Sequence, residues 1–206
     1  GMNYIQFREL FIGGVAFTTR QVMMVLPEFN MANIYRWCKK GYIIKLRNGY
    51  YAFRECLGGG RNNYFLSQFI YRPSYISLQT ALSLYGLIPE AIFSTTAVST
   101  LKTMTFSNEV SSFAYQTISP KLFWGYERFM MKNGKQAYNL ASLEKALLDF
   151  LYLNPYYNTE EDFIELRFDD YIMNDVLDRE TLLSYSQRFG VSSLDHRLRL
   201  LLQVYC

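Results

Sequence analysis

The sequence predicts an α+β protein, with an N-terminal winged helix-turn-helix followed by a mixed α/β domain that ends in a helical segment. Two short helix signals and an Asn-Gly hairpin follow one another between residues 18 and 53. Three consecutive glycines come next, and strand and helix signals then alternate. We therefore expect a winged-helix domain over 1–57, a flexible linker over 58–63 and an α/β domain over 64–206.

The N-terminal domain opens with a helix over 3–11, where apolar residues recur at helical spacing. The second helix begins after Thr18, a residue type that caps helices, and cannot continue past Pro27. Asn30 can cap a third helix over 31–40, which Gly41 ends. This order gives a positioning helix and then a recognition helix.

A basic hairpin follows the third helix. Residues 42–46 and 50–53 are predicted to form strands, and Asn48-Gly49 between them suits a type I′ turn, which needs positive φ at both central residues. Lys45 and Arg47 flank the tip, so we expect a positively charged wing.

Charge is distributed unevenly along the chain. Residues 1–61 carry nine Lys or Arg and three Asp or Glu, a net charge of +6, whereas the whole chain has +3. A basic N-terminal domain on an acidic remainder is the pattern expected if only that domain meets phosphates. Taken separately, an amphipathic basic helix is usually a solvated face, and Asn-Gly hairpins occur in many folds.

Together these features predict binding to double-stranded DNA. Ala32, Asn33 and Arg36 form the outward set at the start of the recognition helix, where base contacts are made. The full set of expected DNA-contacting residues is Thr19, Arg20, Ala32, Asn33, Arg36, Lys39, Lys40, Lys45, Arg47 and Asn48.

The second domain shows helix signals over 64–71 and 78–85 and strand signals over 92–98, 113–118, 126–132 and 136–140. Ser142 caps the most regular helix, 143–153. Further helices are expected over 160–166, 175–189 and 194–205. This order predicts a mixed sheet with helices after it.

Three segments of this domain resemble the AbiEi family of antitoxins, predicted transcriptional regulators of phage-defence loci. They are Ser74–Leu82, Tyr85–Pro89 and Ser142–Asp149. The N-terminal domain is similar to that family's winged helix, so the resemblance covers nearly the whole chain. Family members often carry Pro where Leu143 stands and His where Tyr85 stands.

The resemblance implies a repressor of its own operon that counteracts a nucleotidyltransferase-like toxin without a stable complex. It also implies that the helix bearing Glu144, Lys145 and Asp149 shapes the partner or antitoxin surface. In a second hypothesis, the α/β domain binds protein or RNA as the main activity and the winged helix only autoregulates.

Enzyme chemistry is not expected. Ser142 to Lys145 matches Ser-x-x-Lys, but Ser142 stands where a helix cap belongs and the companion motifs are missing. An acid and lysine cluster of Glu144, Lys145 and Asp149 is better explained by helix amphipathicity than by a nuclease site. His196 is the only histidine and cannot supply a multi-histidine metal site. We expect no catalytic residue, metal site or cofactor.

The cellular setting follows from cysteine usage and hydropathy. The three cysteines are widely spaced and form no Cys-x-x-Cys, and no apolar run approaches the length of a membrane span. We expect a cytoplasmic protein without a membrane partner.

Overall fold

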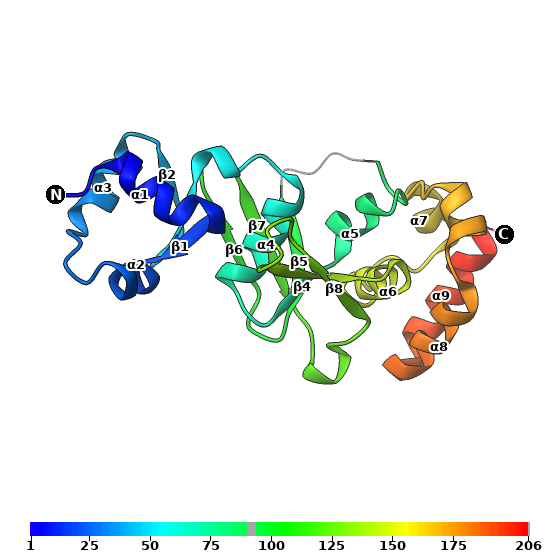
Figure 1. Cartoon of the computed structure of the whole chain (residues 1–206). Coiled ribbons are helices and arrows are strands. Elements are labelled where there is room, and N and C mark those ends of the chain that lie inside the picture. The colour runs from blue at the N-terminus through cyan, green and yellow to red at the C-terminus, as the bar shows by residue number, and fades with distance from the viewer. Residues whose placement is uncertain (90–93, 206) are drawn as a thin grey trace.

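The computed structural model describes residues 1–89 and 94–205. The protein is an α+β molecule with a mixed sheet, and the N-terminal elements lie at one end, the C-terminal helices at the other and the large sheet between them (Figure 1). The expected strand over 92–98 begins in residues outside the described ones; its described part is β5, Thr95–Ser99.

The N-terminal unit, residues 1–57, contains helices around a small antiparallel sheet of order β1-β3-β2. Its elements are α1 (Tyr4–Phe11), a 3₁₀ turn (Ile12–Gly14), β1 (Ala16–Thr18), α2 (Thr19–Val25), α3 (Ala32–Lys39), β2 (Ile43–Arg47), β3 (Tyr50–Phe53) and a second 3₁₀ turn (Arg54–Cys56). β1 could not be predicted from the sequence, because three residues are too few to show an alternation of apolar and polar side chains.

The body, from residue 60 onward, is built on a sheet of order β6-β7-β5-β4-β9-β8. β4 with β9 and β5 with β7 run parallel, while the other pairs run antiparallel, so the sheet is mixed as expected. Besides β5, its strands are β4 (Ser74–Ile76), β6 (Met104–Ser107), β7 (Ser112–Thr117), β8 (Tyr126–Met130) and β9 (Ala137–Ala141).

Helices pack on this sheet and on one another. α4 lies against β4, β5 and β9, while α6 packs on α5, α8 and α9. The helices are α4 (Gly60–Ile70), α5 (Leu78–Leu84), α6 (Leu143–Leu153), α7 (Glu160–Glu165), α8 (Arg179–Phe189) and α9 (Ser192–Val204), with a 3₁₀ turn at Pro120–Leu122 and a π turn at Ile172–Val176. The expected helix over 175–189 therefore starts later, at the Asp178 cap.

The N-terminal unit has an aromatic core of its own. It consists of Phe7, Phe17, Val22, Ile34, Trp37, Ile43 and Phe53. Ile34 and Trp37 thus pack within the unit rather than on the body. Other apolar residues of the unit join the large body core instead, namely Val15, Ala16, Ile44, Leu46, Ala52 and Leu57.

The expected linker over 58–63 is only partly irregular. α4 begins at Gly60, so Gly60 to Asn63 form its first turn. Asn62 Nδ2 donates to the Cys56 carbonyl, 3.1 Å away, which ties this turn to the N-terminal unit. Composition suggested a flexible stretch, but Gly59 and Gly60 use positive φ (100° and 66°) for a sharp entry into the helix.

Candidate nucleic-acid interface

α2 begins and ends where the sequence predicts. Thr18 Oγ1 accepts from the Gln21 amide (3.0 Å) and Gln21 Oε1 accepts from the Thr18 amide (2.8 Å), a reciprocal cap. The helix ends at Val25, and Pro27 follows its C-cap residue Leu26. Arg20 is exposed and Thr19 is half-buried, so the first turn of α2 presents one free cation to solvent.

α3 presents a polar face opposite its buried Ile34 and Trp37. The helix begins at Ala32 with Met31 as its N-cap residue, so Asn30 does not occupy the expected cap position, although its Oδ1 accepts from the Ala32 amide at 3.0 Å. The exposed side chains of the expected set are those of Ala32, Arg36, Lys39 and Lys40.

Asn33 does not belong to that exposed face, which corrects the sequence prediction. Its side chain is buried, with 9% of the residue exposed, and its Oδ1 accepts a hydrogen bond from Arg36 Nη2. At 100° per residue Asn33 lies beside Ile34 and Trp37, on the packed side. Asn33 therefore positions Arg36 and is not itself free to read a base.

Tyr35 takes the place on this face that sequence reasoning gave to Asn33. It is 63% exposed, and Lys39 Nζ lies 4.8 Å from its ring centre. The helical spacing of Tyr35 from Ala32 and Lys39 places it on the exposed face. The sequence prediction instead placed Tyr35 in the core because its side chain is largely apolar. The exposed face thus combines three cations with one aromatic ring.

The hairpin turn differs from the expected type I′ geometry. Gly49 has a φ of 84°, whereas Asn48 is not among the residues with positive φ. The register shifts between Lys45 and Arg47, which marks an irregularity in β2. Such a bulge supplies the extra twist that a type I′ turn would otherwise provide. Lys45 and Asn48 are exposed.

Arg47 faces the body and not the solvent at the hairpin tip, which is a second correction. Its Nη1 donates to the Ile70 carbonyl at 2.8 Å, and its guanidinium carbon lies 4.7 Å from the centre of the Phe106 ring. The sequence could not show this, because the contact depends on how α4 and β6 pack beside the hairpin.

Arg72 extends the basic region from the N-terminal unit onto the body. This exposed residue shares a cavity of about 480 Å³ with Thr18 and Gln21 of the α2 cap and with Arg47. Nothing in its local sequence pointed to this position, since it follows α4 in the body. Cations of both parts of the chain therefore lie around the start of α2.

Two of the three residues expected at a partner surface are buried. Lys145 and Asp149 have no exposed area, and Lys145 Nζ donates to Asp149 Oδ1 at 2.7 Å. Tyr75 and Ser77 hydroxyls both donate to Asp149 Oδ2 at 2.8 Å. The sequence suggested an amphipathic helix with these side chains outside, but α6 is covered on several sides by α5, α8 and α9.

Burial determines the electrostatics of the Lys145–Asp149 cluster. Burial raises the pKa of Asp149 and lowers the pKa of Lys145, while their mutual hydrogen bond opposes both changes. Three aromatic rings enclose Lys145 Nζ, with the centre of the Trp124 ring 4.9 Å away. The arrangement links β4 to α6 through buried polar contacts.

Glu144 is the remaining member of that expected surface. It is half-buried, its Oε2 accepts from the Asp178 amide at 3.2 Å, and burial raises the pKa of its carboxyl group. It lines a cavity of about 260 Å³ together with Tyr85 and Glu127. This part of the body surface is acidic and partly apolar.

Within residues 1–89 and 94–205, no three His, Cys, Asp or Glu side chains gather as a metal site would require. Within the same two ranges, each helix is too short or too polar to span a lipid bilayer.

No protein-family model matches the chain, and no curated protein does either.

Proposed function

We propose that this chain is a sequence-specific DNA-binding regulator and that residues 1–57 act as a winged helix-turn-helix. The observation that supports this best is the exposed face of α3, where Arg36, Lys39 and Lys40 lie opposite a buried aromatic core. α3 packs against β2, which carries exposed Lys45, so helix and hairpin can meet one duplex together.

Each part of this surface has a separate role in the proposal. Arg36 can pair with guanine in the major groove, while Lys39, Lys40 and Lys45 contact phosphates. Arg20 at the start of α2 and Arg72 on the body add phosphate contacts at the flank. Arg47 holds the hairpin against the body and makes no contact with DNA.

Titration of the chain with DNA selected from a random pool, followed by fluorescence anisotropy at several salt concentrations, tests the proposal. The double variant Arg36→Ala/Lys40→Ala should weaken binding at least tenfold and flatten the salt slope by about one unit, because Lys40 is the phosphate contact of the pair. A matched control, Lys121→Ala/Arg128→Ala, removes two exposed body cations and should leave both quantities unchanged. Equal losses in the two double variants would reject the assignment.

The AbiEi resemblance extends the proposal to an antitoxin that represses its own operon. In this reading the body counteracts a nucleotidyltransferase-like toxin, and the acidic cavity of Glu127 and Glu144 is the surface available for that task. The test is co-expression with a nucleotidyltransferase encoded beside this gene. Growth rescue that survives Arg36→Ala/Lys40→Ala but is lost in Glu127→Gln/Glu144→Gln would support it, whereas no rescue by the wild-type chain would contradict it.

A further inference from the structure

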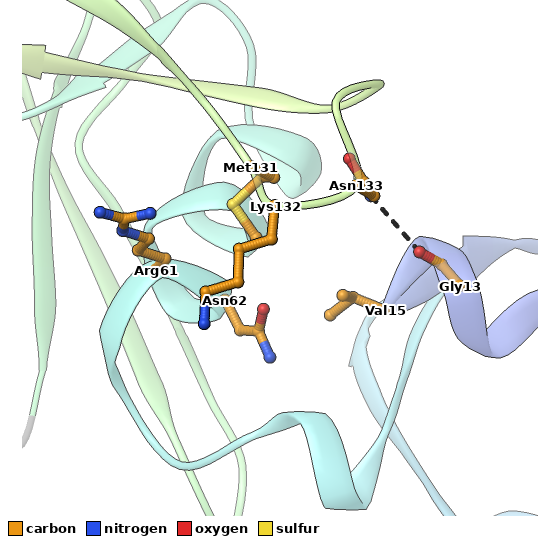
Figure 2. Close-up of a pocket in the computed structure, with 7 residues that line it drawn as sticks. All are labelled: Gly13, Val15, Arg61, Asn62, Met131, Lys132 and Asn133. Atoms are coloured by element: carbon orange, nitrogen blue, oxygen red, sulfur yellow. Dashed lines mark hydrogen bonds between the residues drawn. The ribbon is translucent and has the colours of Figure 1, made fainter.

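A cavity with a charged lining lies between the N-terminal unit and the body. It measures about 610 Å³, and residues from three separate segments form its walls (Figure 2). They are Gly13 and Val15 of the N-terminal unit, Arg61 and Asn62 of the first turn of α4, and Met131, Lys132 and Asn133 of the β8–β9 turn.

Two hydrogen bonds close one side of this cavity. Gln136 Nε2 donates to the Gly14 carbonyl at 3.0 Å, and Asn133 Nδ2 donates to the Gly13 carbonyl at 3.4 Å. Asn133 and Gly13 are both lining residues, and Figure 2 shows the bond between them. The β8–β9 turn is thereby fixed to the N-terminal unit, so the wall is built by contacts from both sides.

The charged groups of the lining are all positive. Arg61 and Lys132 are exposed, no Asp or Glu lines the cavity, and neither cation takes part in an ion pair in the described part of the chain. Figure 2 shows the Lys132 side chain extending toward the first turn of α4. Val15 and Met131 supply buried apolar surface beside these cations.

We propose that this cavity binds a phosphate-bearing small molecule of about nucleotide size. Two unpaired cations suit a dianion, and the Arg guanidinium matches the geometry of phosphate oxygens. The apolar wall can take the non-phosphate part, and the cavity volume lies in the range of small-molecule sites, about 300–1,000 Å³. Because the walls come from both parts of the chain, the bound molecule stabilises their present arrangement. The same phosphate chemistry could also come from a DNA backbone.

The first arm of the experiment uses the full chain without DNA, at constant ionic strength. Pyrophosphate, ATP and adenosine are titrated by isothermal calorimetry, and amide NMR shifts locate the binding. We expect saturable binding of pyrophosphate and ATP but not adenosine, with shifts at Gly13 and Asn133. Arg61→Gln and Lys132→Gln should each weaken binding about tenfold, because each removes one charge-assisted contact.

Matched controls are Lys121→Gln and Arg128→Gln, which remove exposed body cations outside the cavity. All four positions are exposed, so thermal melts without ligand should show that each variant folds as the wild type does. Equal weakening by control and cavity variants would mean diffuse attraction and would overturn the proposal.

The second arm separates the two sources of phosphate. If the ligand is a free molecule, Arg61→Gln and Lys132→Gln bind duplex DNA like the wild type. If pyrophosphate and ATP fail to saturate and both variants lose DNA affinity with a reduced salt slope, the cavity contacts a DNA backbone and the small-molecule assignment is wrong. Absence of both effects rejects the site altogether. None of these results depends on Arg36 or Lys40, so the proposed function stands or falls separately.

Discussion

At the scale of single residues, Gly125 shows how closely the buried cation is enclosed. Its φ is 81°, and a Cβ atom there would lie 2.6 Å from Lys145 Cγ. Both the backbone conformation and the contact exclude a side chain. The backbone at Gly125 thus lies directly against the Lys145 side chain, where any other residue would clash with it.

Substitution of this glycine should be costly. Gly125→Ala combines a left-handed alanine, about 1–2 kcal/mol, with overpacking of about 1–3 kcal/mol, so we expect a loss of about 3 kcal/mol in urea unfolding. Gly134→Ala is the matched control, because Gly134 has a similar φ (68°) and nothing within 4 Å of its Cβ position. It should lose only the backbone part. Similar losses at both positions would show that the Lys145 contact has no effect.

The Lys145–Asp149 pair makes a second prediction at this scale. Asp149→Ala leaves a buried ammonium group without its carboxylate and should cost about 3–5 kcal/mol. Lys145→Met should cost less, because Tyr75 and Ser77 still donate to Asp149. The double variant Lys145→Met/Asp149→Ala should cost less than the sum of the single changes. Urea denaturation of the four proteins measures this coupling, and additive losses would contradict it.

At the scale of elements, the sequence correctly predicts the side-chain caps of α2 and α6. Ser142 Oγ accepts from the Lys145 amide at 3.1 Å, and Thr18 caps α2, both as expected from residue type and position. Caps are local, so neighbouring residues determine them. The places of Asn33 and Arg47 depend on tertiary packing, and the wrong predictions for them have that origin.

The α8 cap gives stability a pH dependence. Backbone and side-chain hydrogen bonds from Thr181 hold the pKa of Asp178 below its ordinary value of 3.8. A lowered folded-state pKa means that the contribution is present above about pH 4 and is lost as the pH falls further. Asp178→Asn keeps a capping side chain but has no carboxyl group to titrate. Thermal melts between pH 7 and pH 3 should fall less steeply for this variant than for the wild type; parallel curves would contradict the assignment.

Base reading and phosphate contact should divide between α3 and the hairpin. We expect Arg36→Ala to relax the preference at one operator position, a discrimination of about 1–3 kcal/mol, and Lys45→Ala to weaken all sequences equally. Asn33→Ala should resemble a weaker Arg36→Ala, because Asn33 orients that guanidinium. Selection from a randomised site with the three variants side by side is the measurement. A changed sequence preference in Lys45→Ala alone would reverse the assignment.

At the scale of the whole molecule, the sequence suggested two independent domains, and the packing joins them more closely. The N-terminal unit has its own aromatic core, but Ile44 and Leu46 of the hairpin are buried in the cluster that continues through the body. Arg54 Nη1 also pairs with Glu109 Oε1 at 2.7 Å across the same boundary. A glycine run shows where a chain can bend, but it says nothing about the surfaces that meet on either side.

This packing predicts that the unit and the body unfold together. Arg47 is the residue to test, because its hydrogen bond to the Ile70 carbonyl and its position over the Phe106 ring fasten the hairpin to the body. Arg47→Lys keeps the charge but loses the planar, forked guanidinium. We expect one calorimetric transition for the wild type and two for the variant, the lower one reporting the N-terminal unit.

Arg20→Lys, on the exposed start of α2, is the matched control and should keep one transition. Two transitions in the wild-type chain would show that the shared core is too small to couple the two parts. The sequence prediction of two independent domains would then be correct.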